Sequence, residues 1–374
     1  GSEGQGCGRS GRSGRGGAMR VPTISLAAYH RALEAADGDK TGTAADEAAT
    51  LSEMFASDSK EEKAAGLSDL VAAVRTACEE VGFFVVVDHG IDEGLLESQR
   101  QECAAFFARP PQSLILSMVR GSTSRFAWLD FVPPPQEATE LAGRSDVCGA
   151  TWSLGPVEGR GSMPWQPDTE QLSSTWASYY AAMERLVSTL MQLFALALGL
   201  PAGAFGPALQ GHRSSMRALL YSEVAEAELQ ASAGAVVRSA EHTDWGCVTV
   251  LLPDKDVGGL EIRGKDGTWS PVLPTPGGLV VNLGDLLPRW TCGRWVATPH
   301  RVVAGRETRH QRLSIPYFGL VNRDTVLTPL VQPHTAGEDN SDDKERDFRP
   351  VAAGAFFDRH EEYMRRQRAS AVTP

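Results

Sequence analysis

Cysteine is scarce in this sequence, and the few residues present are irregularly spaced. The chain of 374 residues has six cysteines, and none of them forms a Cys-x-x-Cys pair. This spacing excludes a disulfide-dense secreted scaffold and a cysteine-based zinc module, and it favours free thiols in a reducing compartment, the cytoplasm. The cysteines are Cys7, Cys78, Cys103, Cys148, Cys247 and Cys292.

Two further absences restrict the class of protein. No stretch approaches the roughly 18 to 20 uninterrupted apolar residues that a membrane-spanning helix needs. Basic residues are outnumbered, with 36 Lys and Arg against 47 Asp and Glu and a formal net charge of −11. Because nucleic-acid binding depends on neutralising phosphates, this balance argues against a nucleic-acid partner. It leaves a small-molecule partner open, since the charge of a pocket is local.

The first residues lack the apolar segment of a secretory signal. Residues 1–18 are rich in Gly, Ser and Arg, and a signal peptide needs an apolar core instead. We expect residues 1–20 to be a disordered tail or tag, with the opening Gly-Ser as a cloning scar and Met19 as a native start. A transit peptide is the alternative interpretation.

Short apolar runs separated by turn residues dominate the region between residues 242 and 318. They are Val248 to Leu252, Gly258 to Ile262, Trp269 to Val272 and Gly277 to Leu283. Such a succession is typical of an antiparallel sandwich or jelly roll. We therefore expect a mainly β core in residues 201–330.

The rest of the chain is expected to surround this core. Residues 21–200 should form an N-terminal α/β region packed on it, and residues 331–374 a charged loop followed by a C-terminal helix. Within the N-terminal region, apolar spacing predicts helices over Ala27 to Ala36 and Leu67 to Val81. The intervening segment, Asp37 to Lys63, is polar and is expected to be a mobile surface insertion.

Three residues form a candidate metal site. His242 and Asp244 are two residues apart, so both can point to one side at a strand end, and His300 would arrive from another strand. Two imidazoles and one carboxylate are the ligand set of non-haem Fe(II) with an open face. Taken alone, a His-x-Asp pair more often caps a turn or faces solvent. The site is favoured by its conjunction with Arg301-Val302 after the second histidine and an Arg-x-Ser pair, Arg312 and Ser314, further on.

These motifs occur in the order seen in one known family. The chain resembles the isopenicillin N synthase-like branch of the Fe(II)/2-oxoglutarate-dependent oxygenases from about Val21 to Tyr363. The matching segments are Val21 to Leu26, Gly82 to Ile91, His242 to Asp244, Gly278 to Asp285, His300 to Val302 and Arg312 to Ser314.

The resemblance implies a double-stranded β-helix (jelly roll) core with an N-terminal helical region, and Fe(II) with 2-oxoglutarate and O2 as cosubstrates, with ascorbate as a further candidate reductant. It also implies that Arg312, Ser314 and Tyr221 bind 2-oxoglutarate, which is released as succinate and CO2. Ser222 stands where the family usually has proline, which weakens the assignment of Tyr221. Because Asp244 is intact, the resemblance implies hydroxylation, desaturation or ring closure of a small molecule, and not halogenation.

Three residues are candidates for substrate binding. Arg125 and Trp128 occupy the place where similar enzymes offer an Arg and an aromatic residue, and Phe318 is expected on the inner face of the strand that carries Arg312. A guanidinium group binds carboxylates in a bidentate fork, so Arg125 favours a carboxylate-bearing substrate. The resemblance implies an amino-acid-derived or terpenoid-like secondary metabolite. The alternative is that Arg125 is a surface residue and Trp128 a core residue.

Two other functions stay open at this stage. One is an iron-dependent oxidase that does not use 2-oxoglutarate, and the other is a non-catalytic binding protein on the same fold. For the enzyme we expect a monomer with a small-molecule substrate, no membrane association and no nucleic-acid partner.

Overall fold

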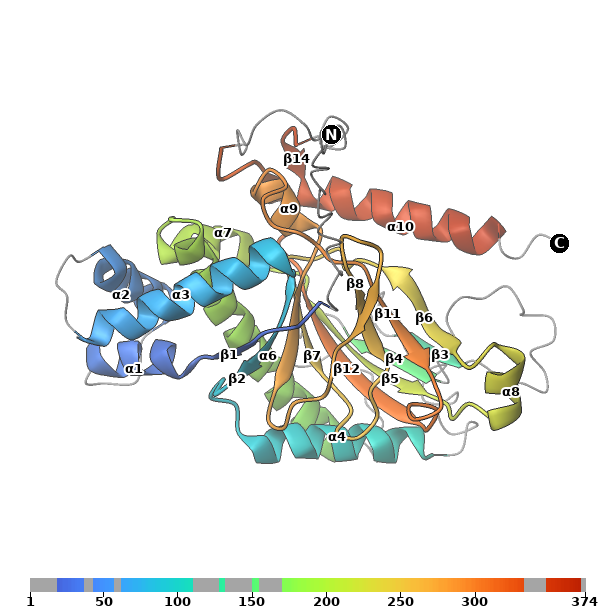
Figure 1. Cartoon of the computed structure of the whole chain (residues 1–374). Helices are drawn as coiled ribbons and strands as arrows, with labels where there is room; N and C mark the ends of the chain where they lie inside the picture. Colours follow the sequence, from blue (N-terminus) through green and yellow to red (C-terminus); the bar gives the residue numbers. More distant parts are fainter. Residues whose placement is uncertain are drawn as a thin grey trace, which may run out of the picture.

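Two β-sheets form the centre of the molecule (Figure 1). The computed structural model describes residues 19–36, 43–56, 62–109, 128–131, 150–154, 170–332 and 348–370. The large sheet has eight strands, in the order β1 (Thr23–Ser25), β2 (Phe83–Val87), β10 (Leu279–Leu283), β7 (Val248–Leu252), β12 (Arg312–Gly319), β5 (Ser215–Tyr221), β4 (Ala150–Leu154) and β3 (Trp128–Phe131). All neighbouring strands of this sheet are antiparallel except β1 and β2.

A smaller sheet of four strands packs against the large one. Its order is β6 (Val236–His242), β11 (His300–Ala304), β8 (Leu260–Arg263) and β9 (Trp269–Pro271). Apolar side chains from both sheets form one buried cluster, which includes Phe83, Tyr221 and Val280 from the large sheet and Ile262 and Val302 from the small one. The two sheets therefore enclose a common interior, as the expected double-stranded β-helix requires.

Helices cover the other face of the large sheet. Strand β2 shows how the sequence produces this arrangement, because its apolar residues are buried on both faces. Phe83 and Val85 belong to the interior cluster, whereas Phe84 and Val86 pack with the helices, as the two-residue period of a strand dictates. The helices of the described residues are α1 (Ala27–Ala36), α2 (Ala44–Ala56), α3 (Glu62–Glu80), α4 (Glu93–Phe107), α6 (Glu170–Ala197), α7 (Gly206–Leu209), α8 (Glu226–Ala231), α9 (Leu286–Trp290) and α10 (Ala353–Ser370). Of these, α8 packs instead on β6 and β11 of the small sheet.

Short elements complete the described part of the chain. They are a 3-10 helix, η3 (Ala202–Phe205), and a two-stranded sheet of β13 (Val326–Leu327) and β14 (Val351–Ala352). Among the described residues, no helix combines the length and the apolar character needed to cross a membrane. The antiparallel sheets and the N-terminal helices confirm the predicted fold class.

One expectation for the N-terminal region is wrong. The segment from Asp37 to Lys63 is not simply a surface insertion, because Ala44–Ala56 within it form helix α2. The polar composition conceals an apolar side, since Ala48 and Leu51 are buried in the main hydrophobic core. Alanine has the highest helix propensity, and packing against the core adds the stabilisation that a short helix needs.

Candidate active site

Two neighbouring strands of the small sheet bring the two histidines together. His242 is the last residue of β6 and His300 is the first residue of β11. The strands are antiparallel and pair these two residues directly, so their side chains start from adjacent positions at the same end of the sheet. Their ring centroids are 4.3 Å apart. The strand order therefore joins residues that are far apart in the sequence.

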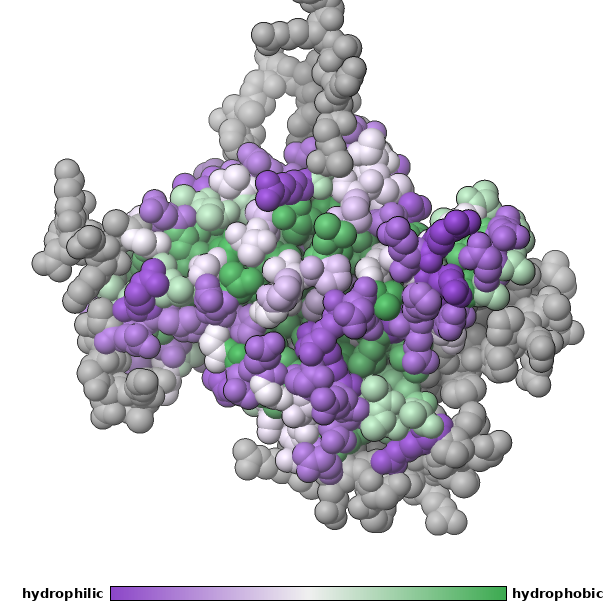
Figure 2. All heavy atoms as spheres, turned by 60° about the horizontal axis from the view of Figure 1, so that its bottom comes forward, coloured by the Kyte–Doolittle hydropathy of each residue, from purple (hydrophilic) through white to green (hydrophobic). Residues whose placement is uncertain are grey.

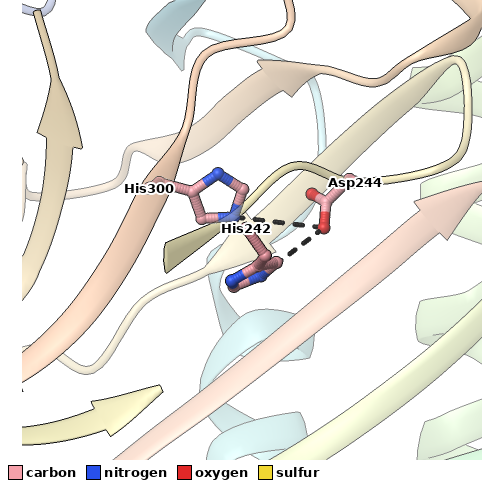
Figure 3. Close-up of side chains that lie close together, drawn as sticks. All are labelled: His242, Asp244 and His300. Carbon is pink, nitrogen blue, oxygen red and sulfur yellow. Dashed lines mark ion pairs between the residues drawn. The ribbon is translucent and has the colours of Figure 1, made fainter. Parts of the chain in front are cut away.

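Asp244 completes the cluster from the turn that follows β6 (Figure 3). Its Oδ1 atom lies 3.9 Å from Nε2 of His242 and 4.0 Å from Nε2 of His300. One ligand atom from each of the three residues lies within 4.8 Å of the others. Ligand atoms about 2.1 Å from one ion are separated by up to about 4 Å. The cluster therefore fits a single metal ion once its three ligand atoms move slightly closer together.

Hydrogen bonds turn both imidazoles toward the centre of the cluster. Nδ1 of His242 lies 2.7 Å from the carbonyl oxygen of Ala240, and Nδ1 of His300 lies 3.2 Å from that of Thr298. When Nδ1 donates its proton to a carbonyl, Nε2 carries the free lone pair, which is how histidine ligands are commonly oriented. In both residues Nε2 is the atom that faces Asp244.

Asp244 is oriented in the same manner. Its Oδ2 atom accepts hydrogen bonds from Oγ1 of Thr249 at 2.6 Å and from Nδ2 of Asn282 at 2.7 Å. This leaves Oδ1 to face the histidines. Burial raises the pKa of this carboxyl group, but the two histidines and the two hydrogen bonds outweigh it, so the net shift is downward. Asp244 is therefore ionised at neutral pH, as a metal ligand must be.

The histidines differ in exposure. Burial lowers the pKa of His300, which keeps the ring neutral and available for a metal at physiological pH. Phe83 packs edge-on against it with ring centroids 5.3 Å apart. The His242 side chain is 44% exposed, so the cluster is open on this side. A buried side that holds the ligands and an open side that admits small molecules suit a catalytic metal centre.

Close backbone contacts fix the turn that carries Asp244. The amide of Asp285 donates to the carbonyl of Asp244 at 2.8 Å. A β-carbon on Gly246 would overlap the carbonyl oxygen of Gly319, and one on Gly284 would overlap the carbonyl oxygen of Gly246. Only glycine permits such an approach, so Gly246 and Gly284 let this turn pack directly on two strand ends.

Helix α10 contacts the same turn. Asp285 Oδ2 accepts a hydrogen bond from Oγ1 of Thr243 at 3.2 Å and lies 3.6 Å from Nε2 of His360. The hydrogen bond to Asp285 raises the pKa of His360. Trp245 is half-buried and packs on the His360 ring, with centroids 5.4 Å apart. No sequence pattern indicates the role of His360, because the contact joins segments that the sequence does not relate.

The predicted cosubstrate residues lie together at the other end of the interior. Arg312, the first residue of β12, pairs with Tyr221 of β5, and its guanidinium carbon is 5.5 Å from the centre of the tyrosine ring. Arg312 is 2% exposed and Ser314 is 4% exposed. Both stand on the same face of the strand, two residues apart. A permanent cation in an apolar interior is suited to a carboxylate such as the distal group of 2-oxoglutarate.

A second buried arginine, which no sequence pattern indicates, lies behind Tyr221. Arg238 of β6 donates hydrogen bonds to the carbonyl oxygens of Ser222, Thr308, Arg309 and His310, at 2.7 to 3.0 Å. Its charge is thus used to fix the loop before β12. The signal in the sequence is weak, since one Arg in an alternating strand is ordinarily a surface residue.

The three predicted substrate contacts have different outcomes. Phe318 pairs with Thr249, whose hydroxyl group binds Asp244, so this position is adjacent to the candidate metal centre. Trp128 begins the edge strand β3, but its side chain is outside what the structure describes. Arg125 lies outside the described residues. The structure therefore places Phe318 beside the site, and the other two assignments stay predictions.

Comparisons with known proteins agree with this site. The model of the 2OG-Fe(II) oxygenase superfamily matches residues 214–320, and that of the non-haem dioxygenase in morphine synthesis N-terminal region matches residues 49–113. The solved structure of a full-length Neurospora crassa protein in complex with alpha-KG has a similar fold. Its TM-score is 0.68 at 22% identity, covering 91% of this chain and 95% of that one.

Similar sequences lead to the same family. The chain is 31% identical to gibberellin 20 oxidase 2 of Oryza sativa subsp. indica over 271 residues, which are 71% of this chain and 66% of the relative, so it spans just under two thirds of that protein. It is 32% identical over 292 residues to the 2-oxoglutarate-Fe(II) type oxidoreductase hxnY of Emericella nidulans, covering 73% of this chain and 80% of the relative. At this identity and coverage, the chain belongs to the 2OG-Fe(II) oxygenase superfamily.

Proposed function

We propose that this protein is an Fe(II)- and 2-oxoglutarate-dependent dioxygenase that oxidises a small molecule. The observation that carries the proposal is the convergence of His242, Asp244 and His300, with Nε2, Oδ1 and Nε2 facing one point. Membership of the oxygenase superfamily supports the choice of Fe(II) over other metals that accept the same ligands. In this proposal the three side chains are the protein ligands of the iron.

The residues of the chain then have distinct tasks. Iron and 2-oxoglutarate, when bound, supply the oxidation of the substrate by O2, with release of succinate and CO2. Three protein ligands leave the remaining coordination positions for the cosubstrates. Arg312 holds the distal carboxylate of 2-oxoglutarate in the interior, beside Tyr221 and Ser314. Because Asp244 would be a ligand of the iron, we propose hydroxylation, desaturation or ring closure as the outcome, and not halogenation.

The substrate is a small molecule, and we propose a carboxylate-bearing secondary metabolite. The names of the relatives refer to chemically diverse small molecules, among them gibberellin, homoarginine and validamycin A. Because substrates vary this widely within one family, the substrate of each enzyme must be inferred from the residues of its own pocket. In this chain the argument for a carboxylate is the predicted substrate contact Arg125, which lies outside the described residues.

Succinate release coupled to O2 uptake tests the proposed reaction. The purified chain is reconstituted with Fe(II) without oxygen, given 2-oxoglutarate and then O2, and succinate is measured by mass spectrometry. We expect succinate from the wild type, none from Asp244→Ala, and an undiminished yield from Asp266→Ala, a matched control whose carboxylate lies in an exposed turn.

The same experiment separates the alternative functions. Iron binding and O2 uptake without succinate would overturn the proposal in favour of an oxidase that does not use 2-oxoglutarate. Iron binding with neither O2 uptake nor succinate, with and without ascorbate, would favour a binding protein. The alternative functions therefore differ in a single set of measurements.

We further propose a monomer that acts in the cytoplasm and has neither a nucleic-acid nor a membrane partner. On the face seen in Figure 2, hydrophilic residues surround separate groups of hydrophobic ones. The exposed large hydrophobic residues of the described part are spread over several elements: Phe55, Val237, Leu273, Val326 and Leu330. Cys78, Cys103, Cys247 and Cys292 are free thiols, in keeping with a reducing compartment. Light scattering after gel filtration tests the monomer.

A further inference from the structure

Arg217 of β5 lies on the strand face that lines the interior of the two sheets. Tyr221 and Leu219 pack in the interior cluster, and Arg217 follows at the same two-residue spacing, which places it on the same face. The first two side chains are buried or half-buried, whereas Arg217 is exposed. Along this face, the strand therefore runs from a closed interior to a position that solvent and ligands can reach.

This exposed position is close to the candidate metal centre. The guanidinium carbon of Arg217 is 5.1 Å from the centre of the Phe318 ring. Phe318 pairs with Thr249 on the next strand, and the Thr249 hydroxyl group donates to Asp244 at 2.6 Å. Neighbouring strands are about 4.8 Å apart, so the guanidinium group lies on the order of 10 Å from the metal ligands.

The interior face of β5 thus has a cation near each end. Arg312 pairs with Tyr221 at one end, and Arg217 is four residues from Tyr221, or about 13 Å along the strand. Arg312 is buried and Arg217 is exposed. The distal carboxylate of 2-oxoglutarate is matched to the buried cation.

We propose that Arg217 binds a carboxylate of the substrate, whose apolar body lies on Phe318. This inference rests on the proposed function and names the substrate class of the same site. Arginine presents paired N–H donors that match the two oxygens of a carboxylate. Contact with the Phe318 ring also limits the motion of the guanidinium group, which reduces the entropy lost on binding. Phe318 therefore serves both as a support for the cation and as an apolar wall.

A binding experiment with matched probes tests this inference. The enzyme is loaded with Fe(II) and 2-oxoglutarate without oxygen, and phenylacetate, cinnamate, decanoate and the methyl ester of each are titrated by calorimetry. We expect at least one acid to bind the wild type about 10-fold or more tightly than its ester, since charged hydrogen bonds contribute on this scale. In Arg217→Met, which keeps the apolar stem, this preference should disappear, and Arg217→Lys should restore part of it.

Arg306→Met is the matched control, because Arg306 is 85% exposed on the loop before β12, and it should keep the preference. A wild type that binds no acid better than its ester would overturn the inference, as would a preference that survives in Arg217→Met. A rise in the 2-oxoglutarate KM of Arg217→Met equal to that of Arg312→Leu would assign Arg217 to the cosubstrate and also refute it. Because the titration needs no turnover, its result is independent of succinate release.

Discussion

Replacing Thr249 by valine removes one of the two hydrogen bonds that orient Asp244. Valine has nearly the shape of threonine, so the change is confined to the hydroxyl group that donates to Oδ2 at 2.6 Å. A hydrogen bond to a charged group contributes about 1.5 to 3 kcal/mol. Asn282 still donates at 2.7 Å, so we expect the lower part of this range, or about a 10-fold rise in the Kd for Fe(II). Combining the change with Asn282→Ala should raise the Kd by about 100-fold or more.

Anaerobic calorimetry with Fe(II), repeated with Mn(II), measures this effect. Thr268→Val is the matched control, because Thr268 also donates to an aspartate at 2.6 Å, but in the exposed turn at Asp266. The control should bind iron like the wild type. An Fe(II) Kd for Thr249→Val equal to that of the control would refute the reasoning. The orientation of Asp244 would then not depend on the hydrogen bond that Thr249 donates to its Oδ2 atom.

Three further predictions concern the cosubstrate, pH and the core. Arg312→Leu should raise the KM for 2-oxoglutarate about 10- to 100-fold in succinate assays, and an unchanged KM would contradict its role. Burial lowers the pKa of His300 in the folded state, so the unfolded chain takes up this proton first as the pH falls. The Tm of the metal-free protein should therefore drop between about pH 7 and pH 5.5. Calorimetry of His300→Gln should show a smaller drop in Tm over the same range. Phe194→Ala removes a fully buried ring that packs on Phe84 and Trp295, so it should lower the free energy of unfolding in urea by about 3 to 5 kcal/mol. Leu273 is 69% exposed, and Leu273→Ala should lower it by about 0.5 kcal/mol or less.

The regular parts of the fold could be predicted because local patterns determine them. The apolar run Val248–Leu252 becomes a central strand, and the predicted helix Ala27–Ala36 has the expected bounds. The polar composition around α2 hides that helix, because helix formation there depends on the burial of Ala48 and Leu51 against other elements. The division of the chain at residues 20, 200 and 330 stays a prediction.

The candidate site shows the same limit. Alternation along a strand was enough to place Phe318, and two-residue spacing was enough to relate His242 to Asp244. His300 was added because it occurs together with Arg301-Val302 and the Arg-x-Ser pair, but its direct pairing with His242 depends on strand order, which spacing does not give. The His360 contact with Asp285 joins residues 75 positions apart, and no local pattern marks it. Arg125 and Trp128 stay predictions as substrate contacts.

The turn between β6 and β7 has a consequence for how the protein acquires its metal. Gly246 and Gly284 let the turn touch the main chain at Gly319 and at the end of β10, and such contacts form when the sheets assemble, whatever ion is present. Folding therefore positions the Asp244 carboxylate before any metal binds, and metal binding requires little further rearrangement of the turn. Enlarging Gly246 or Gly284 to alanine would push the main-chain segments apart and displace Asp244 without altering any of the three ligands.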